Sequence, residues 1–141
     1  MFTEVKKVFW RKRMNIFSIL VPKQMLTYLN ANDPVDKAVE FVLESGYTAV
    51  PVIDDEGRFV AIASEGDFLR RVMDCGRDNL TNYRVKDIVK LDPEGAVLNT
   101  ASEEEIYEKI LDRNFLAVVD DRGCFVGIIT RKTVIMKLHK D

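Results

Sequence analysis

"VIDDEGRFVAIAS" at residues 52–64 and "VVDDRGCFVGIIT" at residues 118–130 are two versions of one hairpin, and they decide the fold. Seven of the thirteen positions are identical, and equivalent residues lie 66 positions apart. In each copy an apolar run is followed by Asp-Asp-x-Gly and a second apolar run, which predicts strand, turn and strand. Gly57 and Gly123 are free to take the positive φ of such a turn. The pair indicates that one structural unit is duplicated.

Helical segments flank both hairpins, so that each copy has the order β-α-β-β-α. Apolar residues at helical spacing predict one buried side for every helix. The predicted buried positions are Val35, Ala38, Val39, Val42, Leu43, Phe68, Leu69, Val72 and Met73 in the first copy, and Tyr107, Ile110, Leu111, Val134, Ile135 and Leu138 in the second. One unit of roughly 50 residues is marginally stable alone. We therefore expect an α/β fold in which the two units pack as a pseudo-twofold pair.

The duplication also predicts the boundaries along the chain. Residues 21–73 form the first repeat, the polar residues 74–84 a linker, and residues 85–141 the second repeat. Residues 1–20, which mix basic with aromatic side chains, are expected to be a helical or partly disordered segment that packs on the body or on a second subunit. An amphipathic helix on a membrane surface is the alternative interpretation of this segment.

Composition and charge exclude several classes of protein. The chain is 47% hydrophobic and 31% charged with a net charge of −2, so it has no basic field for a nucleic acid polymer. No apolar run approaches the roughly 20 residues that span a bilayer. Cys75 and Cys124 are far apart, and the single histidine, His139, lies near the C-terminus. We expect a reduced, cytoplasmic protein with no metal site, no cofactor and no catalytic residues, and therefore not an enzyme.

The repeated order and the run "GYTAVPVIDDEGRFVAIASEGD" at residues 46–67 resemble the CBS domain, arranged in tandem as a Bateman module. The resemblance covers residues 21–139. More narrowly, "SGYTAVPVID" and the terminal "GIITRKTVIMKLHK" are similar to the small stand-alone CBS proteins of bacteria that bind cyclic di-AMP. The family implies two related clefts between the repeats, where adenine nucleotides bind and change the activity of a partner protein.

The family ends its last strand with Ser/Thr-x-x-Asp, whose hydroxyl and carboxylate reach ribose or phosphate. The first repeat has this motif complete, with Ser64 and Asp67, whereas the second has Thr130, Arg131 and Lys132 and lacks the carboxylate. Arginine grips a phosphate with a bidentate fork, and a helix N-terminus also favours anions. Because Glu65 stands where the second copy has Arg131, we expect one phosphate-binding cleft and a second that is vacant, structural or selective for a less charged ligand.

The resemblance further implies that the phosphate-binding cleft takes its other wall from the first repeat. The matching positions are Met25 and Thr27, expected in the first strand, and Thr48 and Ala49. Thr48 is expected to donate to phosphate or base, and the backbone of Ala49 to contact the adenine edge.

These inferences predict a homodimeric sensor that binds an adenine nucleotide and signals to an unidentified regulated protein. Cyclic di-AMP is the leading ligand, followed by AMP, ADP or ATP. The competing interpretation is a CBS module without a ligand, in which the repeats serve dimerisation and protein interaction.

Overall fold

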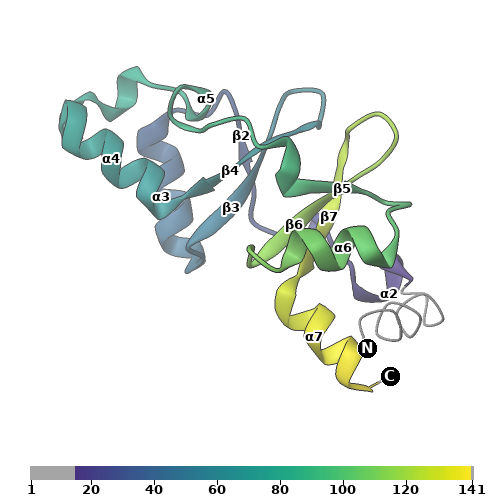
Figure 1. The fold of residues 1–141 in the computed structure, drawn as a ribbon. Helices are drawn as coiled ribbons and strands as arrows, with labels where there is room; N and C mark the ends of the chain where they lie inside the picture. Colours follow the sequence, from purple (N-terminus) through teal and green to yellow (C-terminus); the bar gives the residue numbers. More distant parts are fainter. Residues whose placement is uncertain (1–14, 141) are drawn as a thin grey trace. The chain divides into compact units, whose positions relative to one another are not determined.

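Each hairpin of the sequence lies in a sheet of its own, and the computed structural model, which describes residues 15–140, divides into two compact units (Figure 1). Unit 1 combines both ends of the chain, up to Met25 and from Glu94 onward, and unit 2 is Leu26–Pro93. Residues 1–14, most of the predicted N-terminal segment, lie outside the described residues.

Unit 2 contains a three-stranded sheet in the order β2-β3-β4. Strand β2 is parallel to β3, and β3 is antiparallel to β4. Its elements are β2 (Leu29–Asn30), α3 (Val35–Ser45), β3 (Ala49–Ile53), β4 (Phe59–Ser64), α4 (Glu65–Cys75), the 3-10 helix η2 (Arg77–Asn82) and α5 (Val85–Ile88).

Unit 1 repeats this plan with a fourth strand, in the order β1-β7-β6-β5. Its elements are α2 (Ile16–Ile19), β1 (Val21–Pro22), the 3-10 helices η1 (Lys23–Met25) and η3 (Pro93–Gly95), β5 (Ala96–Leu98), α6 (Glu103–Ile110), β6 (Phe115–Val119), β7 (Phe125–Thr130) and α7 (Arg131–Lys140). The mixed α/β fold with one β-α-β-β-α repeat per unit confirms the predicted fold class.

The two hairpin turns have the same geometry, as their shared sequence predicts. Gly57 and Gly123 have φ of 82° and 81°. In the first turn the Asp54 carboxylate accepts the backbone N–H groups of residues 56 and 58 at 3.0 and 2.9 Å. In the second turn the Asp120 carboxylate accepts those of residues 122 and 124, both at 2.9 Å. An aspartate side chain that accepts the backbone N–H groups two and four residues later stabilises the turn. Asp54 and Asp120 therefore have the same structural role in the two copies.

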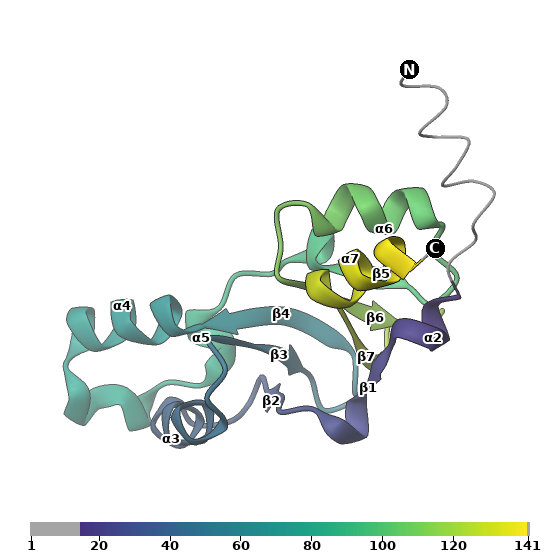
Figure 2. The ribbon, with the colours of Figure 1, turned by 90° about the horizontal axis from the view of Figure 1, so that it is seen from below.

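The N-terminal end of the described chain belongs to the sheet of the second repeat. Strand β1 pairs antiparallel with β7, with Val21 opposite Ile128 and Pro22 opposite Gly127. Ile16 and Ile19 are each 4% exposed in the core of unit 1, and α2 contacts α7 (Figure 2). The compact units therefore differ from the sequence repeats, because residues 21–22 begin the first repeat in the sequence but pair with a strand of the second.

The polar segment after α4 also contributes to a core. Its 3-10 helix η2 buries Leu80, which is 5% exposed, in the core cluster of unit 2, and Tyr83 packs against the same cluster. Val85 at the start of α5 is fully buried there. The short helix α5 thus contributes a buried side chain to the core of unit 2, as the short helix α2 does in unit 1.

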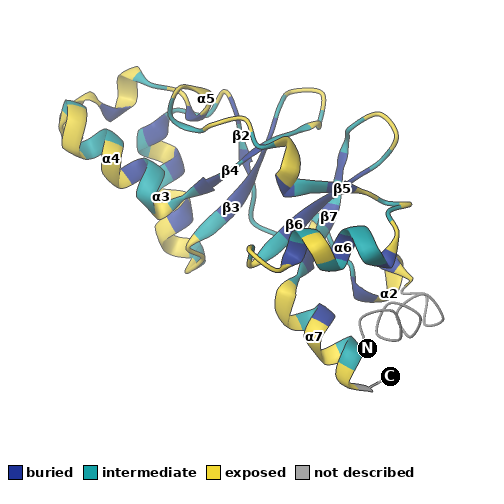
Figure 3. Ribbon diagram, viewed as in Figure 1, coloured by how far each residue is buried: buried dark blue, intermediate teal, exposed yellow. Residues whose placement is uncertain are grey.

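The buried helix faces are narrower than the sequence predicts. Val35, Ala38, Val42, Phe68, Ile110 and Val134 are buried as expected, but the apolar neighbours Leu43, Leu69, Met73, Leu111 and Ile135 are 58–79% exposed, so their predicted burial is wrong (Figure 3). Successive residues of an α-helix point about 100° apart. Leu43, Leu69, Leu111 and Ile135 each directly follow a buried residue and therefore point away from the core, and Met73 follows the half-buried Val72. Among the helices of residues 15–140, none has the length and apolar content needed to cross a membrane.

Candidate functional site

The junction of β7 and α7 in unit 1 carries the predicted Thr-Arg-Lys motif. Thr130 ends β7 opposite Phe115, and Arg131 begins α7. The Thr130 hydroxyl accepts the backbone N–H of Thr133 at 3.1 Å, and the two threonine hydroxyls lie 2.6 Å apart. A hydroxyl that accepts from the third helical N–H is an N-cap. Thr130 therefore caps the N-terminus of α7, where Arg131 and Lys132 are the first two residues.

Arg131 is held from the other side of the hairpin by Asn114, which directly precedes β6. The Arg131 backbone N–H donates to the Asn114 carbonyl at 2.8 Å. Its guanidinium Nη2 donates to the Asn114 side-chain Oδ1 at 3.0 Å. One residue thus contacts both ends of Arg131, the backbone and the charged group.

Asn114 and the Thr-Arg-Lys motif line a surface pocket of about 370 Å³, together with Ile135 and Met136. The lining contains two cations, two neutral polar groups and two apolar side chains, but no acidic residue. The pocket also lies at the N-terminus of α7, where the helix dipole favours negative charge. This arrangement suits an anion that carries an apolar or aromatic group, because cationic and apolar surfaces lie in one pocket.

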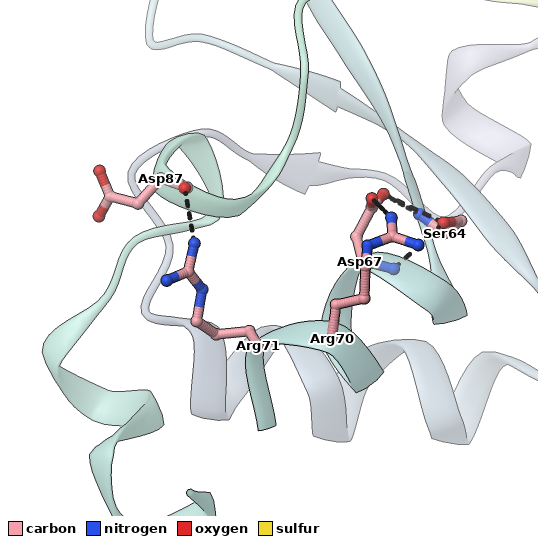
Figure 4. A network of polar contacts seen from close by, with 5 residues as sticks. All are labelled: Ser64, Asp67, Arg70, Arg71 and Asp87. Carbon is pink, nitrogen blue, oxygen red and sulfur yellow. Dashed lines mark hydrogen bonds and ion pairs between the residues drawn. The ribbon is translucent and has the colours of Figure 1, made fainter. Parts of the chain in front are cut away.

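The equivalent junction in unit 2 is a closed capping box (Figure 4). The Ser64 Oγ accepts the backbone N–H of Asp67 at 3.3 Å, and Asp67 Oδ2 accepts the Ser64 N–H at 2.8 Å and its hydroxyl at 3.1 Å. The other carboxylate oxygen, Oδ1, pairs with Arg70 Nη2 at 2.6 Å. Both oxygens of Asp67 are therefore engaged within the chain, and a ribose would have to compete with these bonds.

The next arginine, Arg71, points toward α5 instead. Its guanidinium donates to the Asp87 carbonyl at 3.3 Å (Figure 4). The same guanidinium lies 4.8 Å from the ring centroid of Tyr83. These contacts join α4 to the segment that follows η2. Arg71 thus supports the packing of unit 2.

The two junctions differ in charge at four equivalent positions. Residues 65, 66, 67 and 70 of unit 2 are Glu, Gly, Asp and Arg, and residues 131, 132, 133 and 136 of unit 1 are Arg, Lys, Thr and Met. The junction of unit 2 therefore carries two acids and one arginine, whereas the junction of unit 1 carries two cations and no acid. An anionic ligand is attracted to the junction of unit 1 and repelled by the junction of unit 2.

The other predicted site residues lie outside the pocket lining of unit 1. Met25, 74% exposed, ends the 3-10 helix η1, and Thr27 lies between η1 and β2. Their predicted place in the first strand is wrong, because residues 21–22 pair with β7 of unit 1 whereas residues 29–30 pair with β3 of unit 2. The residues between the two strands join two different sheets.

Thr48 and Ala49 lie beside the unit 2 junction. The Thr48 carbonyl accepts the Glu65 N–H at 2.9 Å, and Ala49 is opposite Ser64 in the sheet. The structure thus brings these two residues together with the capping box, and it separately brings Thr130, Arg131 and Lys132 together in the pocket. The grouping of all five in one cleft stays a prediction.

Sequence reasoning missed three residues of the pocket, Asn114, Ile135 and Met136. Asn114 is 66 positions after Thr48 and accepts the same type of backbone bond. The repeat alignment therefore contained the signal for Asn114. Ile135 was predicted to be buried, and its exposure depends on how α7 packs on the sheet.

The family model of the CBS domain matches residues 20–74 and 83–140, and the chain therefore belongs to the CBS-domain family, with two domains in tandem. Among curated relatives, the cyclic di-AMP receptor B of Bacillus subtilis is 20% identical over 124 residues, which cover 86% of this chain and 84% of the receptor. The homoserine O-acetyltransferase of Methanohalophilus mahii is 25% identical, and this chain spans only 24% of its length.

Solved structures show the same fold. The structure of CbpB in complex with c-di-AMP has a TM-score of 0.82 and 21% identity, covering 98% of this chain and 91% of CbpB. The structure of CBSX2 in complex with AMP has a TM-score of 0.72 and 27% identity, covering 89% of this chain and 96% of CBSX2. This chain therefore has, over most of its length, the fold of proteins that have been solved in complex with c-di-AMP or AMP.

Proposed function

We propose that this tandem CBS chain is a regulatory module that binds an adenine nucleotide, with the phosphate at the Thr-Arg-Lys junction of unit 1. The observation that carries the proposal is the pocket at this junction, which joins Arg131 and Lys132 to an apolar wall and has no acidic lining residue. Guanidinium and ammonium groups bind phosphate through charge-assisted hydrogen bonds. The relatives with cyclic di-AMP or AMP in their names support the choice of ligand class.

Cyclic di-AMP is the leading ligand, and AMP, ADP or ATP are the alternatives. A relative of similar length is named as a cyclic di-AMP receptor. Two adjacent cations also match a ligand with two phosphates better than a nucleoside. Met25, Thr27, Thr48 and Ala49 are proposed to form the other wall of the cleft, as their matching positions in the family imply. Thr48 would donate to phosphate or base, and the backbone of Ala49 would contact the adenine edge.

The junction of unit 2 is proposed to be vacant, structural or selective for a less charged ligand. Glu65 repels phosphate, and the carboxylate of Asp67 is engaged by Ser64 and Arg70. We therefore expect one phosphate-bearing ligand for each chain.

The module is proposed to act by regulation and not by catalysis, through a homodimer and an unidentified partner protein. Leu69 and Met73, spaced four residues apart on α4, are 62% and 79% exposed, and self-association would remove such apolar surface from water. To regulate a partner, the ligand must favour one state of the complex by about 1–3 kcal/mol.

Calorimetric titration with cyclic di-AMP, AMP and ATP tests the proposal, with Arg131→Glu as the variant. A charge-assisted hydrogen bond contributes about 1.5–3 kcal/mol, and a reversed charge adds repulsion, so we expect an affinity loss of about 100-fold or more. Arg122→Glu, in the exposed turn of the same unit, is the matched control and should bind like the wild type.

Light scattering on the same samples measures the oligomeric state and distinguishes a nucleotide sensor from a CBS module that serves only dimerisation and protein interaction. Arg131→Glu should leave the oligomeric state unchanged. A folded, nucleotide-free wild type that binds none of the three nucleotides would instead support a CBS module that serves only dimerisation and protein interaction.

A further inference from the structure

We propose that Asn114 is a positioning residue, which holds the guanidinium of Arg131 at the pocket and so strengthens the binding of phosphorylated ligands. This inference rests on the proposed phosphate site and adds a residue that the Thr-Arg-Lys motif does not contain. It is carried by two contacts to the same residue and by the comparison between the units.

The two contacts fix Arg131 at both ends of a long side chain. The backbone bond to the Asn114 carbonyl, at 2.8 Å, holds the Cα at the strand end, and the bond to Asn114 Oδ1, at 3.0 Å, holds the guanidinium. The long, flexible side chain of an arginine otherwise loses rotamer entropy when a ligand binds. Asn114 restricts that freedom before a ligand arrives.

The bond engages only part of the guanidinium. Arginine has five N–H donors in a planar fork, and Asn114 Oδ1 accepts from Nη2. The remaining donors stay available for a phosphate. Both residues line the pocket, so the held fork is at the surface that a ligand would contact.

Unit 2 retains only the backbone half of this arrangement. The Thr48 carbonyl accepts the Glu65 N–H at 2.9 Å, the equivalent of the bond between Asn114 and Arg131. Glutamate at position 65 offers no guanidinium, so the side-chain half cannot form there. The backbone bond thus occurs in both repeats as part of the fold. The bond from a guanidinium to the asparagine side chain forms only in unit 1, where Arg131 supplies the cation.

The experiment measures Asn114→Ala and Asn114→Asp by two methods. In ligand-free protein, the Nε–Hε NMR signal of Arg131, assigned with Arg131→Lys, reports whether the guanidinium is held. Calorimetry with cyclic di-AMP and AMP then reports binding. Asn82→Asp, at the exposed end of η2, is the control for adding a carboxylate, and circular dichroism confirms that each variant is folded.

We expect that in Asn114→Ala the Nε–Hε signal of Arg131 becomes that of a guanidinium averaged over several rotamers. Nucleotide binding should weaken about 2- to 10-fold, which is the cost of ordering one flexible side chain on binding. Asn114→Asp should weaken it more than about tenfold, because a carboxylate pairs with Arg131 and repels phosphate. Asn82→Asp should bind like the wild type.

Two results would overturn the inference, and they differ in what they say about the function. If the wild type binds nucleotide and both Asn114 variants bind equally well, Asn114 is a structural contact and the phosphate site stands. If the wild type binds none of the nucleotides although its Arg131 signal shows a held guanidinium, the proposed function fails and the positioning role fails with it.

Discussion

Replacing Gly127 with alanine tests whether β1 is seated on β7 as the structure shows. A Cβ at this position would overlap the carbonyl oxygen of Val21 and would lie 2.9 Å from a methyl carbon of Leu20. Atoms in ordinary contact lie about 3.5 Å apart, so β1 would have to move by roughly 1 Å. The backbone of the paired strand cannot yield as the end of a flexible side chain does.

The expected cost follows from this overlap. An extra methyl group in a packed region destabilises a protein by about 1–3 kcal/mol. Alanine also reduces the freedom of the unfolded chain, which offsets about 0.4–1 kcal/mol. We therefore expect Gly127→Ala to lower the free energy of unfolding by about 1–2 kcal/mol and Tm by roughly 2–8 °C.

Urea denaturation and thermal melting followed by circular dichroism measure both quantities. Gly66→Ala is the matched control, because its added Cβ would meet side chains and no backbone, namely the guanidinium of Arg70 at 3.3 Å and the Oγ of Ser64 at 3.6 Å. In the helix α4 this change should stabilise, by up to about 1 kcal/mol. If Gly127→Ala were as stable as the wild type, β1 would not lie against Gly127 in solution, and the assignment of residues 21–22 to unit 1 would be wrong.

Two further predictions concern the packing of α2 and the charge of the pocket. Ile19→Ala should lower the free energy of unfolding by about 2–4 kcal/mol because Ile19 is 4% exposed, whereas Phe17→Ala, at a side chain 63% exposed, should change it by less than about 0.5 kcal/mol; urea denaturation distinguishes them. Nucleotide affinity should fall as NaCl rises from about 50 to 500 mM, because Arg131 and Lys132 are exposed and salt screens their attraction for phosphate. An affinity that calorimetry finds independent of salt would contradict binding through these cations.

The local elements could be predicted because short-range patterns encode them. The Asp-Asp-x-Gly turns form as expected, with Gly57 and Gly123 at positive φ. The stripes of the helices identified the buried side in each case, but they also included residues such as Leu43 and Ile135 that the structure exposes. Helical spacing gives the direction of a face, whereas its width depends on the surface against which the helix packs.

The candidate site could be predicted only in part. The Thr-Arg-Lys motif was found from the resemblance, and the structure places its residues in one pocket. Asn114 was missed because a lone asparagine before a strand has no pattern of its own, and only its alignment with Thr48 of the first repeat pointed to it. Its role depends on the pairing of β6 with β7, which brings residues 114 and 131 together across the hairpin.

The sequence by itself determined that this protein is a duplicated β-α-β-β-α unit of the CBS type with unequal charges at its two strand-to-helix junctions. Those features are local, because periodicity, turn residues and charge can be compared position by position between the copies. Only the tertiary structure decided that residues 16–22 complete the sheet and core of unit 1 and that Asp67 is closed by Ser64 and Arg70. These depend on contacts between residues that meet only after folding, through backbone pairing and side-chain geometry that no single segment encodes.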